Sequence, residues 1–407
     1  MILTLLLSML LMANDPYTNI DRHALKATPE AEKSIESLAK YLIRPARNDR
    51  EKIRAIFRWI AANITYDTRA YYTGIPGHRL SDTLLKERTA ACGGFSTLIE
   101  GLGKAAGLTI IKISGYAKGV HYQIGDHFSG DFNHAWNAVR INGRWELLDA
   151  TWGAGYFDES GRFIREFDDY FFLPDPEDLI YTHFPENSQW QLLAKPVTQE
   201  SFESMPFLKP AFFHHALQMK SHTQGIIQAN DRLTVTLKNP GKAQLTARLI
   251  QNNQYLSERH IFIQNQESEA QIQILFPGSG NYTLRIFTSK QHETGTYLWA
   301  MDYQLISKTE KSNPDGFPEI YRSYKDYQVR LISPVTGRLQ KNMMIRFELI
   351  IPEAIEAFII QGDTWEPMNR NQNRFLKNYP TTSGDLEIGA RFSEIPKLDI
   401  LLKYQVQ

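Results

Sequence analysis

The stretch NHAWNAVRINGRWELLDAT, residues 133–151, decides the fold of the first half of the chain. Two β-rich runs, 135–140 and 145–150, flank Asn142-Gly143, and this dipeptide between two such runs is the strongest short-range signal for a β-hairpin. With Asn142 and Gly143 as a two-residue turn, Asp149 lies opposite Trp136, and His134 lies opposite Thr151. We therefore expect a hairpin with a defined register.

That register brings an imidazole and a carboxylate together. His134 and Asp149 become diagonal neighbours on one face of the hairpin, about 7–8 Å apart at the backbone. Their side chains can close this gap with a hydrogen bond. A carboxylate in this position fixes the tautomer of the imidazole and supports its positive charge. The pair suits a base that activates a nucleophile.

The candidate nucleophile is Cys92, the only cysteine of the chain, in TAACGGFS at residues 89–96. An isolated cysteine is more often a small buried apolar residue. This one, however, begins a predicted amphipathic helix over 92–106, where free N–H groups and the helix dipole stabilise a thiolate. Its own N–H is a natural oxyanion donor, and Gly93 and Gly94 leave room for a substrate carbonyl. Cys92, His134 and Asp149 are thus the predicted catalytic residues.

The rest of the first half predicts helices followed by an antiparallel sheet. One helix begins at Thr28-Pro29-Glu30, with Thr28 as the cap, and ends before Pro45. A second begins at Asn48 and has a regular apolar stripe as far as Ile64. Residues 156–205 read as irregular. This order predicts an α+β domain over residues 28–205.

Short β-rich runs separated by Asn, Gly and Pro turns fill the second half of the chain. They predict two β-sandwich modules of immunoglobulin-like type, over residues 206–307 and 319–407. Residues 308–318 read as a linker between them. The strand order within each module does not follow from this pattern.

Charge and the N-terminus restrict the partners and the location. Lys and Arg together number 45, as do Asp and Glu, so no basic excess exists to bind nucleic acid.

The apolar run MILTLLLSMLLMA at residues 1–13 is too short to span a bilayer and fits a signal peptide. We therefore expect export to the periplasm, the cell surface or the medium, with no stable transmembrane segment after processing. The alternative is an N-terminal helix packed on the body of the protein.

We expect no metal and no cofactor. One cysteine excludes multi-cysteine zinc sites, and His121 with Asp126-His127 lacks a third ligand at metal-site spacing. The stretch GLGKAA at residues 101–106 formally matches a dinucleotide fingerprint. It falls at the end of a predicted helix with no strand before it, so the match fails its structural test.

Three motifs in order resemble the transglutaminase-like superfamily: CGGF at 92–95, NHAWN at 133–137 and DATWG at 149–153. The segment DLIYTHFP at 178–185 is similar to kyphoscoliosis-peptidase-type proteins, and the resemblance covers roughly residues 30–195. It implies a papain-like α+β core, with Cys92 as nucleophile, His134 as general base and acid, and Asp149 as its orienting partner.

Papain-like enzymes often place a Gln upstream of the cysteine as a second oxyanion donor. No Gln precedes Gln123 here. Tyr66 could take that place, but a packing role suits it better, so the second donor stays open.

The resulting hypothesis is a thiol-dependent acyl-transfer enzyme that acts on a protein or peptide. It is a peptidase or amidase if water resolves the thioester, and a transglutaminase if a lysine amine does. The alternative is a catalytically silent scaffold that binds proteins through its β-sandwich modules.

Overall fold

The computed structural model describes residues 16–69, 81–158, 160–266, 268–290, 296–310, 315–393 and 397–407. The chain divides into two compact units, Met1–Glu203 and Ser204–Gln407. The predicted signal peptide, residues 1–13, lies outside the described residues. Within the described ranges, no helix has both the length and the apolar character that crossing a bilayer requires.

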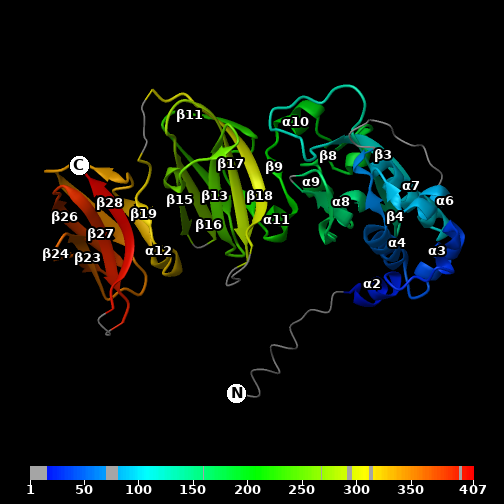
Figure 1. Ribbon diagram of the computed structural model, residues 1–407, viewed down its shortest axis with the longest axis horizontal. Coiled ribbons are helices and arrows are strands. Elements are labelled where there is room, and N and C mark those ends of the chain that lie inside the picture. The colour runs from blue at the N-terminus through cyan, green and yellow to red at the C-terminus, as the bar shows by residue number, and fades with distance from the viewer. Residues whose placement is uncertain are drawn as a thin grey trace, which may run out of the picture. The chain divides into compact units, whose positions relative to one another are not determined.

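Helices form most of the first part of unit 1 (Figure 1). The predicted helix after Asn48 is confirmed: the Asn48 side chain accepts the Glu51 N–H at 2.9 Å, and the apolar stripe that follows is buried. The predicted helix that begins at Cys92 is also confirmed. The bounds are α2 Thr18–Ala24, η1 Ala31–Lys33, α3 Ile35–Leu42, α4 Asp49–Asn63, α6 Ser81–Glu87 and α7 Cys92–Ala105.

The helix predicted to begin at Thr28 starts later. Residues Ala31–Lys33 form one 3₁₀ turn, and α3 begins only after Ser34. Ser34 and Ser37 make reciprocal hydrogen bonds from the backbone N–H of each to the side chain of the other, which satisfy these two N–H groups at the start of α3. This local cap fixes the start of the helix in place of Thr28.

A four-stranded antiparallel sheet, in the order β5-β4-β3-β8, lies against α7. Its strands are β3 Ile110–Ala117, β4 His134–Ile141, β5 Arg144–Leu148 and β8 His183–Pro185. Strand β8 falls inside the stretch 156–205, so the prediction that this stretch is irregular was wrong there. The same stretch holds β6 Gly155–Phe157, β7 Phe163–Arg165, η2 Asp169–Phe171, α9 Pro176–Leu179, η3 Ser188–Gln191 and α10 Gln199–Ser204.

Unit 2 contains two β-sandwiches. The first pairs the sheet β10-β12-β16-β15 with the sheet β11-β18-β17-β13-β14, to which β9 adds at β18. The bounds are β9 Phe207–Leu208, α11 Pro210–His214, β10 Gln218–Met219, β11 Ile226–Ala229, β12 Arg232–Lys238, β13 Gln244–Gln251, β14 Gln254–Tyr255, β15 Ile261–Gln266, β16 Glu269–Leu275, β17 Gly280–Ser289 and β18 Leu298–Ser307.

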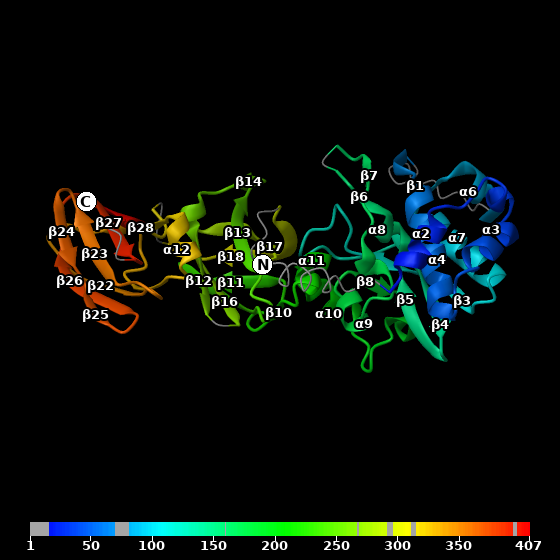
Figure 2. The ribbon, with the colours of Figure 1, turned by 90° about the horizontal axis from the view of Figure 1, so that it is seen from below.

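The second sandwich pairs the sheet β19-β28-β27-β23-β24 with the sheet β20-β22-β26-β25 (Figure 2). The bounds are β19 Glu319–Ile320, α12 Arg322–Asp326, β20 Arg330–Ser333, β21 Arg338–Leu339, β22 Met344–Ile350, β23 Glu356–Gln361, β24 Thr364–Pro367, β25 Asn369–Asn371, β26 Arg374–Pro380, β27 Gly384–Arg391 and β28 Asp399–Val406. The predicted fold class, an α+β core followed by immunoglobulin-like sandwiches, is confirmed.

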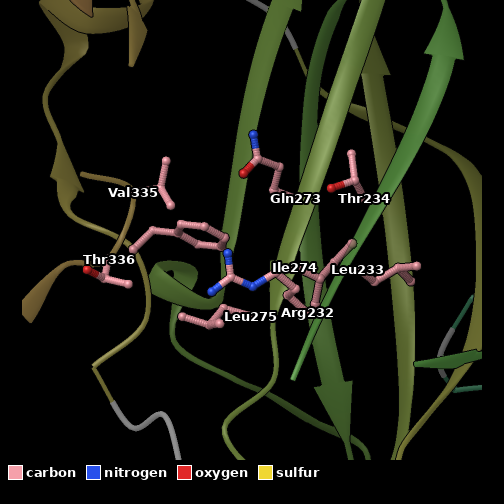
Figure 3. A pocket seen from close by; sticks show the side chains of 9 residues that line it. Arg232, Leu233, Thr234, Gln273, Ile274, Leu275, Val335 and Thr336 are labelled. Atoms are coloured by element: carbon pink, nitrogen blue, oxygen red, sulfur yellow. The ribbon is translucent and has the colours of Figure 1, made fainter. Parts of the chain in front are cut away.

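A small pocket in unit 2 is lined by the first sandwich, by the end of the predicted linker and by the chain that follows it (Figure 3). Arg232, Thr234 and Gln273 come from the first sandwich, while Phe317 and Val335 follow in the chain. None of the predicted catalytic residues lines it, so the candidate chemistry lies in unit 1.

Candidate active site

The hairpin that carries His134 has the predicted register. Asn137 pairs with Leu148, and Ile141 pairs with Arg144. Asn142 and Gly143 have φ values of 49° and 81°, the positive values that a type I′ turn requires. The sequence-based register is therefore confirmed as far as Leu148.

Asp149 does not continue the strand. It is the N-cap of a short helix, α8 (Ala150–Ala154), and its Oδ1 accepts the N–H groups of Thr151 at 2.8 Å and Trp152 at 3.3 Å. The predicted strand to residue 150, and with it the pairing of His134 with Thr151, was wrong. Asp is a strong helix cap, and the Asp149 N–H bonds to Phe171 O, so the chain leaves the hairpin here.

The predicted contact between imidazole and carboxylate is present. His134 Nε2 lies 2.7 Å from Asp149 Oδ2, and both side chains are buried. Burial alone would lower the pKa of His134, but the charge and hydrogen bond of Asp149, together with Cys92, raise it to about 10. Burial alone would raise the pKa of Asp149, but the two histidines beside it hold that pKa well below its usual range. The pair is therefore an ion pair at neutral pH.

Cys92 is the first residue of α7 and is half-buried. The ionisation of its thiol is linked to that of the His134 imidazole. Because Nε2 of that ring is bonded to Asp149, Nδ1 is the nitrogen left for the sulfur. Burial would raise the pKa of Cys92, but the hydrogen bond and the charge of His134 lower it below its ordinary value. The geometry therefore favours a thiolate–imidazolium pair.

The two glycines after Cys92 differ in role. A Cβ on Gly94 would lie 2.7 Å from the Ala90 Cβ, so Gly94 lets α7 pack closely on β2 (Thr89–Ala90) and does not face a substrate. A Cβ on Gly93 would meet only Lys112 Nζ, at 3.3 Å. Only Gly93 retains the predicted role of leaving room for a substrate.

One residue of the site was missed from the sequence. His183, on β8, places its Nε2 3.1 Å from Asp149 Oδ2, the oxygen that His134 also contacts. The motif DLIYTHFP contains it, but no spacing rule connects a three-residue strand with a hairpin more than thirty residues earlier. Only the pairing of β8 with β3 brings His183 into the site.

The donor atoms of His134, Asp149 and His183 lie within 4.8 Å of one another, close enough for a metal ion. Both contacts to Asp149 Oδ2, however, have hydrogen-bond lengths, and each places a ring N–H where a metal would have to bind. We therefore interpret the cluster as hydrogen-bonded residues and not as a metal site.

The remaining sequence candidates lie elsewhere in unit 1. Tyr66 is buried, and its ring contacts Phe95, Phe157 and Phe163, as a packing residue would. His127 Nδ1 contacts Glu203 Oε2 at 2.9 Å, and Asp126 accepts the Gln123 N–H at 2.8 Å. These contacts explain Asp126 and His127 as parts of an ordered loop.

Comparison with known proteins identifies the type of this core. The family model of the transglutaminase-like superfamily matches residues 36–150, which include all three predicted catalytic residues. The chain carries a transglutaminase-like core. The model of the KY-like, immunoglobulin-like domain matches residues 199–318, which contain the first β-sandwich.

Several known proteins are similar to parts or most of this chain. The kyphoscoliosis peptidase of Homo sapiens is 25% identical over 96% of this chain and 77% of its own, so the chain is its distant homologue. Hillarin of Drosophila melanogaster is 31% identical over 53% of this chain and 28% of its own. A solved TGase structure is 21% identical, with a TM-score of 0.21 over 33% of this chain and 36% of that one.

Proposed function

We propose that the transglutaminase-like core is a thiol-dependent acyl-transfer enzyme that acts on an amide of a protein or peptide. The observation that supports this most is the 2.7 Å contact of the His134 imidazole with Asp149, together with the interaction of the same imidazole with the Cys92 thiol, which lowers the pKa of Cys92. Nucleophile, base and orienting carboxylate stand in the order that acyl transfer by a thiol requires.

In the first step the Cys92 thiolate attacks the carbonyl carbon of the substrate amide. A C–S bond forms, and the carbonyl π electrons move to oxygen, where the Cys92 N–H at the start of α7 is positioned to stabilise them. The His134 imidazolium gives its Nδ1 proton to the amide nitrogen. The C–N bond then breaks, the amine leaves, and a thioester on Cys92 remains.

The second step consumes the thioester. His134, now neutral, takes a proton from the incoming nucleophile as it attacks, and the thiolate leaves. Water gives a carboxylic acid, the outcome of a peptidase or amidase, whereas a lysine amine gives a new amide. We favour hydrolysis, because the homologue that extends over most of the chain is named a peptidase.

The nucleophile can be tested without knowing the substrate. Iodoacetamide should alkylate Cys92 quickly at about pH 6, where an ordinary thiol is almost wholly protonated. His134→Ala should slow this reaction strongly, whereas His127→Ala, a substitution of an exposed histidine outside the site, should not. Slow alkylation of the native protein, indifferent to His134, would contradict the proposal.

Turnover is tested separately, by incubating the full chain with a peptide library and searching Cys92 for a thioester by mass spectrometry. A reactive Cys92 that never forms an acyl-enzyme with any peptide would favour the second candidate. That candidate is a silent core whose partners bind the sandwiches, the first of which falls within the immunoglobulin-like match over residues 199–318. Export, predicted from residues 1–13, is likewise a proposal, and cell fractionation tests it.

A further inference from the structure

Asp149 accepts hydrogen bonds on both carboxylate oxygens, and His183 supplies one that the proposed mechanism does not use. Oδ1 accepts from Thr151 N and Trp152 N. Oδ2 contacts His134 Nε2 at 2.7 Å and His183 Nε2 at 3.1 Å. The Asp149 side chain is only 1% exposed, so water does not solvate this charge.

We propose that His183 is a positioning residue that, as a neutral imidazole, donates its Nε2–H to Asp149 Oδ2 and keeps this buried carboxylate ionised beside His134. The inference rests on the proposed function, because it assigns a role within the same site. His183 acts only through Asp149.

The tautomer follows from the contacts of the ring. Thr182 Oγ1 lies 2.9 Å from His183 Nδ1 and 3.2 Å from Leu179 O. When the ring is neutral with Nδ1 unprotonated, the single hydroxyl hydrogen goes to that nearer nitrogen. Nε2 must then carry the proton, and it faces the Asp149 carboxylate. The opposite tautomer would direct a lone pair of Nε2 at an anion, which is unfavourable.

The surroundings of His183 keep it neutral. Its ring lies against Trp136, Trp152 and Phe171, with ring-centre distances of 5.0, 4.6 and 6.4 Å, and the side chain is 1% exposed. Burial among these rings holds the pKa of His183 below its ordinary value, although the Asp149 charge opposes this effect. The titratable groups that act on His183 are Asp149 and His134, and Cys92 acts on His134 in turn.

A donor is needed here because a buried ion pair can collapse. In an apolar site, proton transfer from His134 to Asp149 would leave two neutral groups, which desolvation favours. Each N–H directed at the carboxylate opposes this transfer, since it stabilises the anion. While His134 remains an imidazolium, it also stabilises the Cys92 thiolate beside it. His183 should thus influence the cysteine through two intermediate residues.

Two substitutions separate this role from packing. His183→Phe keeps a ring of similar size but removes the donor, whereas His183→Gln keeps an N–H close to the position of Nε2 and cannot titrate. Both variants are made in the full chain, and their folding is compared with the parent by circular dichroism and thermal unfolding. The pH dependence of Cys92 alkylation by iodoacetamide is then measured.

We expect His183→Phe to move the midpoint of the alkylation profile up by about one pH unit, the size of one hydrogen bond to a charged group. His183→Gln should return it most of the way. A folded His183→Phe protein with the parental profile would overturn the proposal, as would equal shifts in both variants. If His183→Phe fails to fold, ¹⁵N NMR of the parent protein decides. A His183 ring that is protonated on both nitrogens, or on Nδ1 alone, contradicts the inference.

Alkylation requires no turnover, so the two proposals fail in different ways. A midpoint that responds to His183 in a protein that never forms an acyl-enzyme would refute the acyl-transfer function and leave the role of His183 standing. If the protein forms an acyl-enzyme but its alkylation profile does not change on substitution of His183, the acyl-transfer function stands and the role of His183 is refuted.

Discussion

Gly115 lies directly opposite His134 in the pairing of β3 with β4 and opposite Pro185 in the pairing of β3 with β8. Its missing side chain leaves the space that Trp136 occupies: a Cβ there would lie 2.6 Å from Trp136 Cη2 and 2.3 Å from Phe184 O. His134 and His183 belong to strands separated by β3, yet their ring centres are only 5.3 Å apart. Gly115 therefore allows the three strands of the site to pack closely.

Replacing Gly115 by Ala should destabilise the core by roughly 2–4 kcal/mol, because three close neighbours must move and two of them, Phe184 O and Pro185 Cα, are backbone atoms. Gly119→Ala is the matched control, since a Cβ there meets no heavy atom within 4 Å. Thermal unfolding of the full chain measures the difference. Equal melting temperatures of the two variants would show that β3 and β8 can move apart at little cost in stability.

The Asp149→Asn substitution tests the orienting carboxylate. The amide should keep the cap on α8 through its oxygen, while its NH₂ would favour the wrong tautomer of His134. We expect turnover to fall by about three to four orders of magnitude with little loss of helical signal. Near-parental turnover in a folded Asp149→Asn protein would remove Asp149 from the mechanism.

The ionisations of Cys92 and His134 predict a pH profile with two limbs. The thiolate appears as pH rises through the pKa of Cys92, which lies below its ordinary value. The imidazolium is lost as pH rises through the pKa of His134, about 10. The rate constant for acylation of Cys92 should therefore rise from acidic pH to a broad plateau and fall only near pH 10. A narrow maximum near neutrality would contradict the ion-pair assignment.

Helix α10 holds the loop that leads into His134. Lys118 Nζ, which is buried, donates to Phe202 O at 2.7 Å. The Glu203 carboxylate accepts the Phe128 N–H at 2.9 Å, and Gln199 Nε2 donates to Phe128 O at 2.7 Å. Although the family model of the sandwich begins at residue 199, these contacts attach α10 to the core.

Two truncations follow from these contacts. A chain that ends after residue 205 keeps α10 and should retain alkylation of Cys92 and hydrolysis of a small amide, while losing action on a large natural substrate. In a chain that ends after residue 198, the rate of Cys92 alkylation at about pH 6 should fall about tenfold or more, because the loop before His134 is released. If both truncations label Cys92 at the same rate, α10 does not support the site.

The sequence by itself determined several local elements and the register of one hairpin. The Asn142-Gly143 turn fixed the register of the hairpin, since its backbone suits only a tight two-residue loop. The apolar stripe of α4 and the start of α7 at Cys92 also followed from local periodicity. These features depend on neighbours within a few residues, so one sequence is enough to predict them.

Tertiary structure decided what depends on distant segments. Asp149 reaches His134 from a helix cap and not from the strand, because its N–H is taken by Phe171 and its Oδ1 by α8. His183 joins the site only through the pairing of β8 with β3, and Gly115 matters because Trp136 and the backbone of β8 fill the space beside it. Side chains from segments far apart in the chain meet through packing of the whole core, and no local pattern in the sequence encodes that packing.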